Sequence, residues 1–380
     1  MDANLKNQTF LSKDLVCFSH IRWNFVYQRP QHLLTRFAKY MRIFFIEEPV
    51  FGATKDHYKI EQPASNVWVV TPQLQSGDDV EETLEKIVST VLLEFDIHNY
   101  VAWYYTPMAY GFTKHLNPSL VIYDCMDELS AFAFAPPQLK AMEAELFDKA
   151  DIVFTGGVSL YKSKKDKHKN IHPFPSSIDK NHFIQARKLK SELQKNEKPV
   201  VGFYGVVDER MDIELLRSIA ALKPEWNYEV IGPVVKIDPA SLPVADNIQY
   251  LGMKSYQELP ALIAKWDIAM MPFALNDSTK FISPTKTPEY MAAGLPVIST
   301  AINDVVDPYG VNGLAYIINT PEEFVKAGEH ILQSTRYDEW LQDVDNFLAE
   351  NSWDNTWSRM ATIIKETQLQ KLNAKAKIYV

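Results

Sequence analysis

The sequence alternates short apolar segments with amphipathic segments of helical period, and this pattern restarts in the second half of the chain. The first half predicts strands at residues 14–19, 42–47, 67–70, 101–105, 120–125 and 151–155, and helices at residues 30–41, 80–95 and 136–150. Uninterrupted apolar strands that are separated by helices indicate a parallel sheet with both faces covered. The first half is therefore expected to form an α/β domain.

The same alternation returns after a polar segment at residues 186–198. It predicts strands at residues 199–204, 228–231, 248–251, 267–273, 296–300 and 314–318, helices at residues 212–222 and 255–266, and a mostly helical segment from residue 321 onward. The helix at 255–266 begins with a capping box formed by Ser255 and Glu258. Together, the two halves predict an α/β chain of two Rossmann-like domains facing a cleft, joined by a linker at 186–198.

Composition narrows the class of protein. The chain has 380 residues, with 46% hydrophobic and 23% charged residues, which is typical of a globular protein with sizeable cores. Its net charge of −9 disfavours a general nucleic-acid coat. The chain has only two cysteines, Cys17 and Cys125, and both lie in apolar segments. Two cysteines cannot form a disulfide framework, which favours a reducing compartment. The absence of a signal-peptide pattern and of a long apolar span predicts a cytoplasmic protein.

One basic run stands out in this acidic chain. Residues 161–169 carry five lysines and one aspartate. A solvated loop is one interpretation of this run. The other is peripheral docking of Lys162–Lys169 at the inner face of the plasma membrane, because an anionic surface attracts each nearby positive charge by about 1 kcal/mol.

The glycine motifs disfavour two nucleotide-binding classes. Neither G-x-G-x-x-G nor G-x-x-x-x-G-K-[ST] occurs, which weakens the case for an NAD enzyme or a P-loop kinase. Instead, a predicted strand ends in a glycine turn at residues 202–210. Gly205 would let a ligand approach the backbone, and Arg210 could hold a phosphate through several donors. The alternative is an ordinary turn with a surface arginine.

Residues 281–300 form the most informative segment, which runs from a loop through a short helix to Gly294 and a strand. Pro288 falls near the helix start, where its missing N–H costs nothing. Lys286 and Glu289 are three residues apart and can face the same side. A helix N-terminus with a lysine favours an anion, and a carboxylate accepts from two vicinal hydroxyls. This combination suits the diphosphate and ribose of a nucleotide, whereas a surface ion pair is the alternative.

Several segments, taken in order, resemble one enzyme family. Residues 283–298 resemble the nucleotide-sugar motif of GT-B glycosyltransferases, family 4-like (glycosyl transferases group 1). Residues 20–34 resemble the N-terminal segment of teichuronic-acid and exopolysaccharide transferases of this type. Similarity to further parts of the family is found at residues 150–155, 175–179, 201–210 and 352–357. The resemblance thus covers most of the chain.

This resemblance implies a fold and a reaction. It implies an acceptor-binding domain at 1–185, a nucleotide-sugar-binding domain at 199–350, and a C-terminal helix at 351–380 that packs back on the first domain. The reaction would move a sugar from a nucleoside diphosphate sugar, most simply a UDP sugar, to a glycan or lipid-linked acceptor in bacterial surface polysaccharide synthesis. It would be metal-independent and retaining, with no cofactor.

The resemblance also implies roles for single residues. Glu289 would bind the ribose hydroxyls, and Lys286 and Arg210 would hold the diphosphate. Backbone or hydroxyl donors to phosphate would come from Gly205, Ser283 and Thr285. Pro284, which has no N–H to donate, would line the same site, whereas Gly252 and Met253 would line the base. The expected catalytic residues are Asp127, His20 and Lys286. For Asp127 the alternative is a helix N-cap, and for His20 it is a structural role.

The sequence departs from the family pattern at one position. The family often carries two glutamates eight residues apart, and the first of them would fall at position 281, where this chain has Phe281. This change puts the donor-sugar contact and the stereochemistry in doubt. It keeps open a non-catalytic GT-B subunit that binds nucleotide sugar or glycan in an assembly complex, and a GT-B epimerase.

Overall fold

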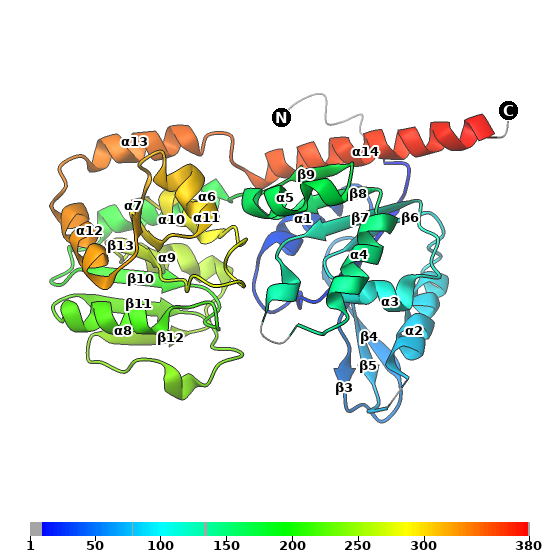
Figure 1. Ribbon diagram of the computed structural model, residues 1–380, viewed down its shortest axis with the longest axis horizontal. Coiled ribbons are helices and arrows are strands. Elements are labelled where there is room, and N and C mark those ends of the chain that lie inside the picture. The colour runs from blue at the N-terminus through cyan, green and yellow to red at the C-terminus, as the bar shows by residue number, and fades with distance from the viewer. Residues whose placement is uncertain (1–9, 78, 133–134, 379–380) are drawn as a thin grey trace. The chain divides into compact units, whose positions relative to one another are not determined.

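The computed structural model describes residues 10–77, 79–132 and 135–378, and these residues form two compact units (Figure 1). Within the described ranges, unit 1 contains the chain up to Gly156, Leu160–Phe174 and the chain from Asp354 onward. Unit 2 contains Gly157–Ser159 and Pro175–Trp353. Each unit is built around its own sheet.

Unit 1 contains a sheet with the strand order β3-β5-β2-β1-β6-β7-β8-β9, in which these neighbours are parallel. Strand β4 pairs with β5 in the antiparallel direction. The strands are β1 (Asp14–Ser19), β2 (Arg42–Glu47), β3 (Val50–Phe51), β4 (His57–Ala64), β5 (Val67–Leu74), β6 (Tyr100–Tyr104), β7 (Leu120–Cys125), β8 (Ile152–Thr155) and β9 (Ile171–Pro173). The central strands β1, β6 and β7 are buried along their whole length, as expected for a sheet covered on both faces.

The helices of unit 1 include one from the C-terminal end of the chain. They are α1 (Arg29–Phe37), α2 (Val80–Glu94), α3 (Tyr110–Thr113), α4 (Leu139–Lys149), α5 (Val158–Lys164) and α14 (Trp353–Ile378). The first residues of α5, Val158 and Ser159, and the first residue of α14, Trp353, belong to unit 2. In α14, Asp354 Oδ1 lies 2.7 Å from Arg36 Nε. Trp357 stacks on Tyr40 with ring centres 5.2 Å apart. The C-terminal helix therefore packs on the N-terminal part of the chain.

Unit 2 contains a wholly parallel sheet with the order β12-β11-β10-β13-β14-β15. Its strands are β10 (Val200–Tyr204), β11 (Asn227–Ile231), β12 (Ile248–Gly252), β13 (Ile268–Met271), β14 (Val297–Thr300) and β15 (Ala315–Ile318). Its helices are α6 (Lys180–Phe183), α7 (Gln185–Glu192), α8 (Ile213–Leu222), α9 (Leu259–Ile263), α10 (Lys286–Ala292), α11 (Asn303–Val305), α12 (Pro321–Gln333) and α13 (Tyr337–Phe347). The predicted α/β class with two parallel sheets is confirmed.

Some local predictions differ from the structure. The exposed strand β4 was not predicted, because its side chains face solvent and lack an apolar pattern. The helix expected at 255–266 divides into a 3₁₀ turn at Tyr256–Glu258 and the short helix α9, although the capping box of Ser255 is present. Residues 186–198, which the sequence predicts as a linker, begin within α7, and this helix belongs to unit 2.

The basic run at Lys162–Lys169 is not uniformly solvated. Lys164 is buried, and its ammonium lies 2.7 Å from Glu143 and 2.9 Å from Glu128. Its role is therefore to pair with the acidic groups inside unit 1, and it is not a surface charge. The other four lysines of the run are exposed. None of the helices in the described ranges has the length and apolar content to cross a membrane.

Helix α10 ends in a turn that only glycine fits easily. Gly294 has φ +79°, and its N–H donates to Met291 O while the next N–H, of Leu295, donates to Tyr290 O. This is the Schellman arrangement, which satisfies carbonyls at a helix end. Arg187 of α7 also donates to Ala292 O at 2.8 Å. The C-terminal end of α10 is thus fixed by its own turn and by α7.

Gly294→Ala should destabilise the protein more than Gly313→Ala does. Both glycines have a positive φ, so each alanine carries a backbone strain of about 1–2 kcal/mol. An added Cβ at Gly313 meets nothing within 4 Å, whereas at Gly294 it would lie 2.8 Å from Tyr337 Oη. Urea unfolding followed by tryptophan fluorescence measures both losses, and equal losses would contradict this account of the turn.

Candidate functional site

Three glycines line the carboxyl edge of the sheet in unit 2. Gly205 and Gly232 follow β10 and β11, and Gly252 ends β12. Gly205 N–H donates to Ile231 O at 2.8 Å, and Gly232 N–H donates to Gly252 O at 2.9 Å. A Cβ on Gly232 would lie 1.8 Å from Gly205 O, so no larger residue fits. The row forms a smooth backbone surface that a ligand can approach closely.

Lys286, the first residue of α10, lies next to Gly205 at one end of this glycine row. A Cβ on Gly205 would be 2.1 Å from Lys286 Cε and 2.8 Å from its Nζ. The ammonium is also 5.9 Å from the centre of the Phe203 ring. Gly205 was expected to offer its N–H to a ligand, but that N–H is used by Ile231 O. Its missing side chain makes room for Lys286 instead.

Glu289 is buried one turn further along α10. The Tyr204 hydroxyl at the end of β10 donates to its carboxylate, and Tyr204 is itself fixed because its N–H donates to Tyr290 Oη at 2.8 Å. Burial raises the pKa of Glu289 to about 7, against the lowering effects of the Tyr204 hydrogen bond and of the Lys286 charge, while Asp179 raises it further. Glu289 therefore titrates near neutral pH.

The loop after β10 carries three charged residues in sequence. Arg210 donates to both carboxylate oxygens of Asp208, with Nη2 2.7 Å from Oδ2. A phosphate at Arg210 would therefore share the guanidinium with Asp208. Both carboxylate oxygens of Glu209 are buried and accept no hydrogen bond. A buried carboxylate in this state is costly, and ligand hydroxyls would relieve the cost.

Asp304 contacts the loop before α10 and the start of α5. The Asp304 carboxylate accepts from the N–H groups of Val158 and Ser159, both at 2.9 Å, and from the side chain of Ser283. Burial raises the pKa of Asp304 against these hydrogen bonds, which lower it. Ser283 thus supports the loop that leads through Pro284 and Thr285 to Lys286. At the far end of the glycine row, Gly252 and Met253 are exposed.

In unit 1, the two expected catalytic residues lie at the carboxyl edge of the sheet. His20 follows β1 and Asp127 follows β7, with β6 between these strands. Two strand spacings separate the backbones by about 10 Å. Both side chains are half-buried. The two residues therefore lie at the same edge of the sheet, but their backbones are too far apart for contact.

Asp124, which precedes Asp127 by three residues, has a structural partner. Arg29 binds its carboxylate with two hydrogen bonds of 3.0 and 2.9 Å, and both residues are buried. Arg29 also donates to Phe174 O at 2.7 Å. Burial raises the pKa of Asp124 against the lowering effect of Arg29. The charge of Asp127 also acts on Arg29, but more weakly than the charge of Asp124 does.

The arrangement in unit 2 suits a ligand that carries phosphates and a diol. Lys286 supplies a positive charge over a glycine surface, and Glu289 supplies a buried acceptor. The sequence reasoning did not identify Tyr204, Gly232 or Glu209. Gly232 could have been found, because it is a glycine directly after a predicted strand. No local sequence pattern points to Tyr204 or Glu209. Within the described ranges, no group of three or more His, Cys, Asp or Glu residues is placed to hold a metal ion.

Comparisons with known proteins find similar sequences and similar folds. Residues 198–334 match the family model of glycosyl transferases group 1. The chain is 24% identical over 270 residues to the Bacillus subtilis (strain 168) protein TuaH, to which a glycosyltransferase role in teichuronic acid biosynthesis is ascribed; the match covers 66% of this chain and 67% of TuaH.

Solved structures share the fold at low sequence identity. A trehalose-6-phosphate structure from E. coli, bound with UDP-2-fluoro glucose, has a TM-score of 0.69 at 12% identity and covers 93% of this chain and 99% of that chain. Sucrose-phosphate synthase from Thermosynechococcus elongatus has a TM-score of 0.65 at 14% identity and covers 97% of this chain and 99% of that chain. Anabaena HepE, in complex with UDP and glucose, has a TM-score of 0.67 at 14% identity and covers 92% of this chain and 98% of that chain. These likenesses confirm the expected GT-B architecture.

Tyr204→Phe should raise the pKa of Glu289 above its value of about 7, because the substitution removes a hydrogen bond that favours the ionised form. Carbon-detected NMR titration of the glutamate carboxyl measures this pKa. Tyr228→Phe is the matched control, since the buried Tyr228 hydroxyl of the same sheet donates to Ile219 O at 2.9 Å and not to Glu289. An unchanged pKa in Tyr204→Phe, or equal shifts in both variants, would contradict the assignment.

Proposed function

We propose that this chain, which is a glycosyltransferase of GT-B type with a glycosyl transferases group 1 domain at residues 198–334, moves a sugar from a nucleoside diphosphate sugar to a glycan or lipid-linked acceptor. The process would be bacterial surface polysaccharide synthesis. The role ascribed to TuaH supports that process, and the UDP compounds in two of the similar structures support a UDP sugar as donor.

One observation carries the proposal. The first turn of α10 places Lys286 over Gly205 and buries Glu289 against the Tyr204 hydroxyl, so a cation and a carboxylate lie together at the carboxyl edge of a parallel sheet. Ligands of open α/β sheets bind at this edge. In the proposed complex, Glu289 accepts from the two ribose hydroxyls and Lys286 contacts the diphosphate. Gly252 and Met253 would border the base.

The proposed chemistry is the transfer of one glycosyl group. The bond between the anomeric carbon and the diphosphate oxygen breaks, and its electron pair stays on the leaving nucleoside diphosphate. Lys286 and Arg210 would stabilise this growing negative charge without a metal ion. The acceptor oxygen bonds to the anomeric carbon, and its proton would pass to Asp127 or His20. Asp127 and His20 in unit 1 are the proposed catalytic side chains on the acceptor side, and retention of configuration is the proposed outcome.

A non-catalytic subunit that binds nucleotide sugar or glycan is the second candidate, and Phe281 favours it. Phe281 places an aromatic ring where the family often has a glutamate. The Lys280 ammonium lies 5.4 Å from the centre of this ring. Location at the inner face of the plasma membrane is also proposed, through the exposed lysines Lys162, Lys165, Lys167 and Lys169.

Turnover separates these candidates. The chain is incubated with UDP, GDP, dTDP and ADP sugars, with and without oligosaccharide and lipid-linked acceptors, and released nucleoside diphosphate is measured. A transferase releases it in step with a glycosylated acceptor. No release with any donor would support the binding subunit, and free epimerised donor without transfer would support an epimerase.

The affinity for UDP-glucose should rise about tenfold between pH 6 and pH 8. Glu289 has a pKa of about 7, its ionised form is the acceptor for ribose, and UDP-glucose has no group that titrates in this range. Glu289→Gln should bind more weakly at pH 8, by about 1.5–3 kcal/mol, with a flat pH profile. Calorimetry measures both variants. An affinity that falls with pH, or a glutamine variant that binds as well as the wild type, would refute the ribose assignment.

A further inference from the structure

Unit 2 has a second pocket at the opposite edge of its sheet. Pro296 and Gly313 line this pocket and precede β14 and β15, whereas Gly205 and Gly252 lie where β10 and β12 end. In a parallel sheet, strand starts and strand ends lie at opposite edges. The pocket, with a volume of about 220 Å³, is therefore separate from the proposed donor site.

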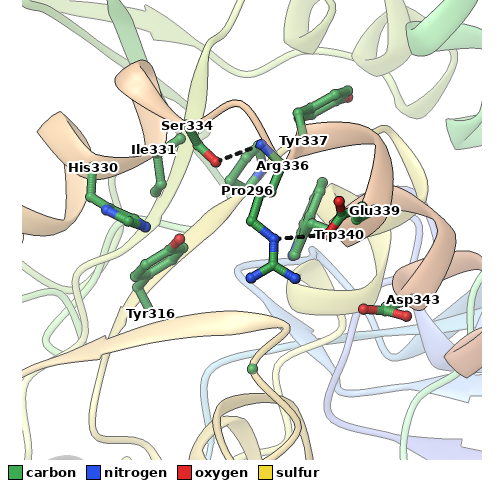
Figure 2. Close-up of a pocket in the computed structure, with 11 residues that line it drawn as sticks. Pro296, Tyr316, His330, Ile331, Ser334, Arg336, Tyr337, Glu339, Trp340 and Asp343 are labelled. Atoms are coloured by element: carbon green, nitrogen blue, oxygen red, sulfur yellow. Dashed lines mark hydrogen bonds and ion pairs between the residues drawn. The ribbon is translucent and has the colours of Figure 1, made fainter.

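Aromatic rings with fixed orientations line the pocket. Trp340 Nε1 donates to Leu314 O at 3.0 Å, and the Tyr337 hydroxyl donates to Gly294 O at 2.7 Å. Both rings are thus anchored by their polar ends to the loops before β15 and β14. Tyr316 and His330 form a pair with ring centres 5.9 Å apart. Figure 2 shows these two rings on one side of the pocket and Trp340 on the other.

Hydrogen-bonding groups lie between the rings. The side chain of Arg336 extends between Tyr316 and Trp340 in Figure 2. Its Nε donates to Glu339 at 2.7 Å, and the two side chains are 80% and 66% exposed. Such an exposed pair contributes little stability and can open readily. Asp343 adds a second carboxylate to the lining.

This chemistry suits a neutral sugar better than an anion. The lining contains one arginine and two acidic residues, so a phosphate or another anion would meet net negative charge. Sugar hydroxyls both donate and accept, which suits a guanidinium beside carboxylates. The C–H face of a pyranose stacks on aromatic rings, and fixed rings lose little entropy on binding.

We propose that this pocket is an accessory binding site for a neutral oligosaccharide or polysaccharide chain, distinct from the donor and acceptor sites. It would hold the enzyme on a glycan while transfer occurs elsewhere. The identity of that glycan rests on the proposed function, but the binding itself does not require turnover. Occupation of the pocket would displace the Arg336–Glu339 pair toward the sugar hydroxyls.

The test uses the full chain on an array of neutral and acidic oligosaccharides of four or more sugars, followed by calorimetry with the best ligands. Neutral oligosaccharides should bind, and Tyr316→Ala and Arg336→Ala should each weaken binding about tenfold. Arg217→Ala is the matched control, because Arg217 and Glu214 form an exposed pair three residues apart on α8, as Arg336 and Glu339 do in the pocket. This variant should bind as the wild type does.

Three results would overturn the proposal. They are no binding by any neutral oligosaccharide on the array, preference for acidic ones, and binding that Tyr316→Ala and Arg336→Ala leave unchanged. Donor turnover, measured on the same preparations, keeps the two proposals apart. Glycan binding without turnover would contradict the transferase alone, and turnover without glycan binding would contradict the pocket alone.

Discussion

Contact between the first turn of α10 and the end of β10 is the interaction on which the account of unit 2 depends. Burying a carboxylate is costly unless it has polar partners, and Glu289 has the Tyr204 hydroxyl and the nearby charge of Lys286. Gly205 permits this contact because a side chain there would collide with Lys286. The far end of α10 is fixed by Gly294 and Arg187, so the helix holds its charged turn in one place.

The sequence predicted much of the fold because buried parallel strands have a strong apolar signal. Strand β4 was missed because it is exposed, and α7 was missed because its polar residues face solvent while Arg187 makes distant contacts. The spacing of Lys286 and Glu289 was visible locally. The contact of Tyr204 with Glu289 was not visible locally, because the two residues are 85 positions apart in the sequence. Lys164 also had a hidden role, because its acidic partners lie on other elements.

Unit 1 shows how neighbouring carboxylates acquire different roles. Asp124 and Asp127 follow each other closely in the sequence, and a pattern alone cannot separate them. Burial and a two-point hydrogen bond with Arg29 commit Asp124 to the core. Asp127 lies beyond the strand end, half-buried. The loop that carries His20 is held by Glu47, whose carboxylate accepts from Trp23 N–H at 2.8 Å.

A crystal structure of the chain with bound UDP-glucose tests the central claim most directly. The account predicts that both ribose hydroxyls lie within hydrogen-bond distance of the Glu289 carboxylate and that the diphosphate lies beside Lys286 over Gly205. A nucleotide bound elsewhere, for example between Tyr316 and Trp340 at the other edge of the sheet, would contradict it.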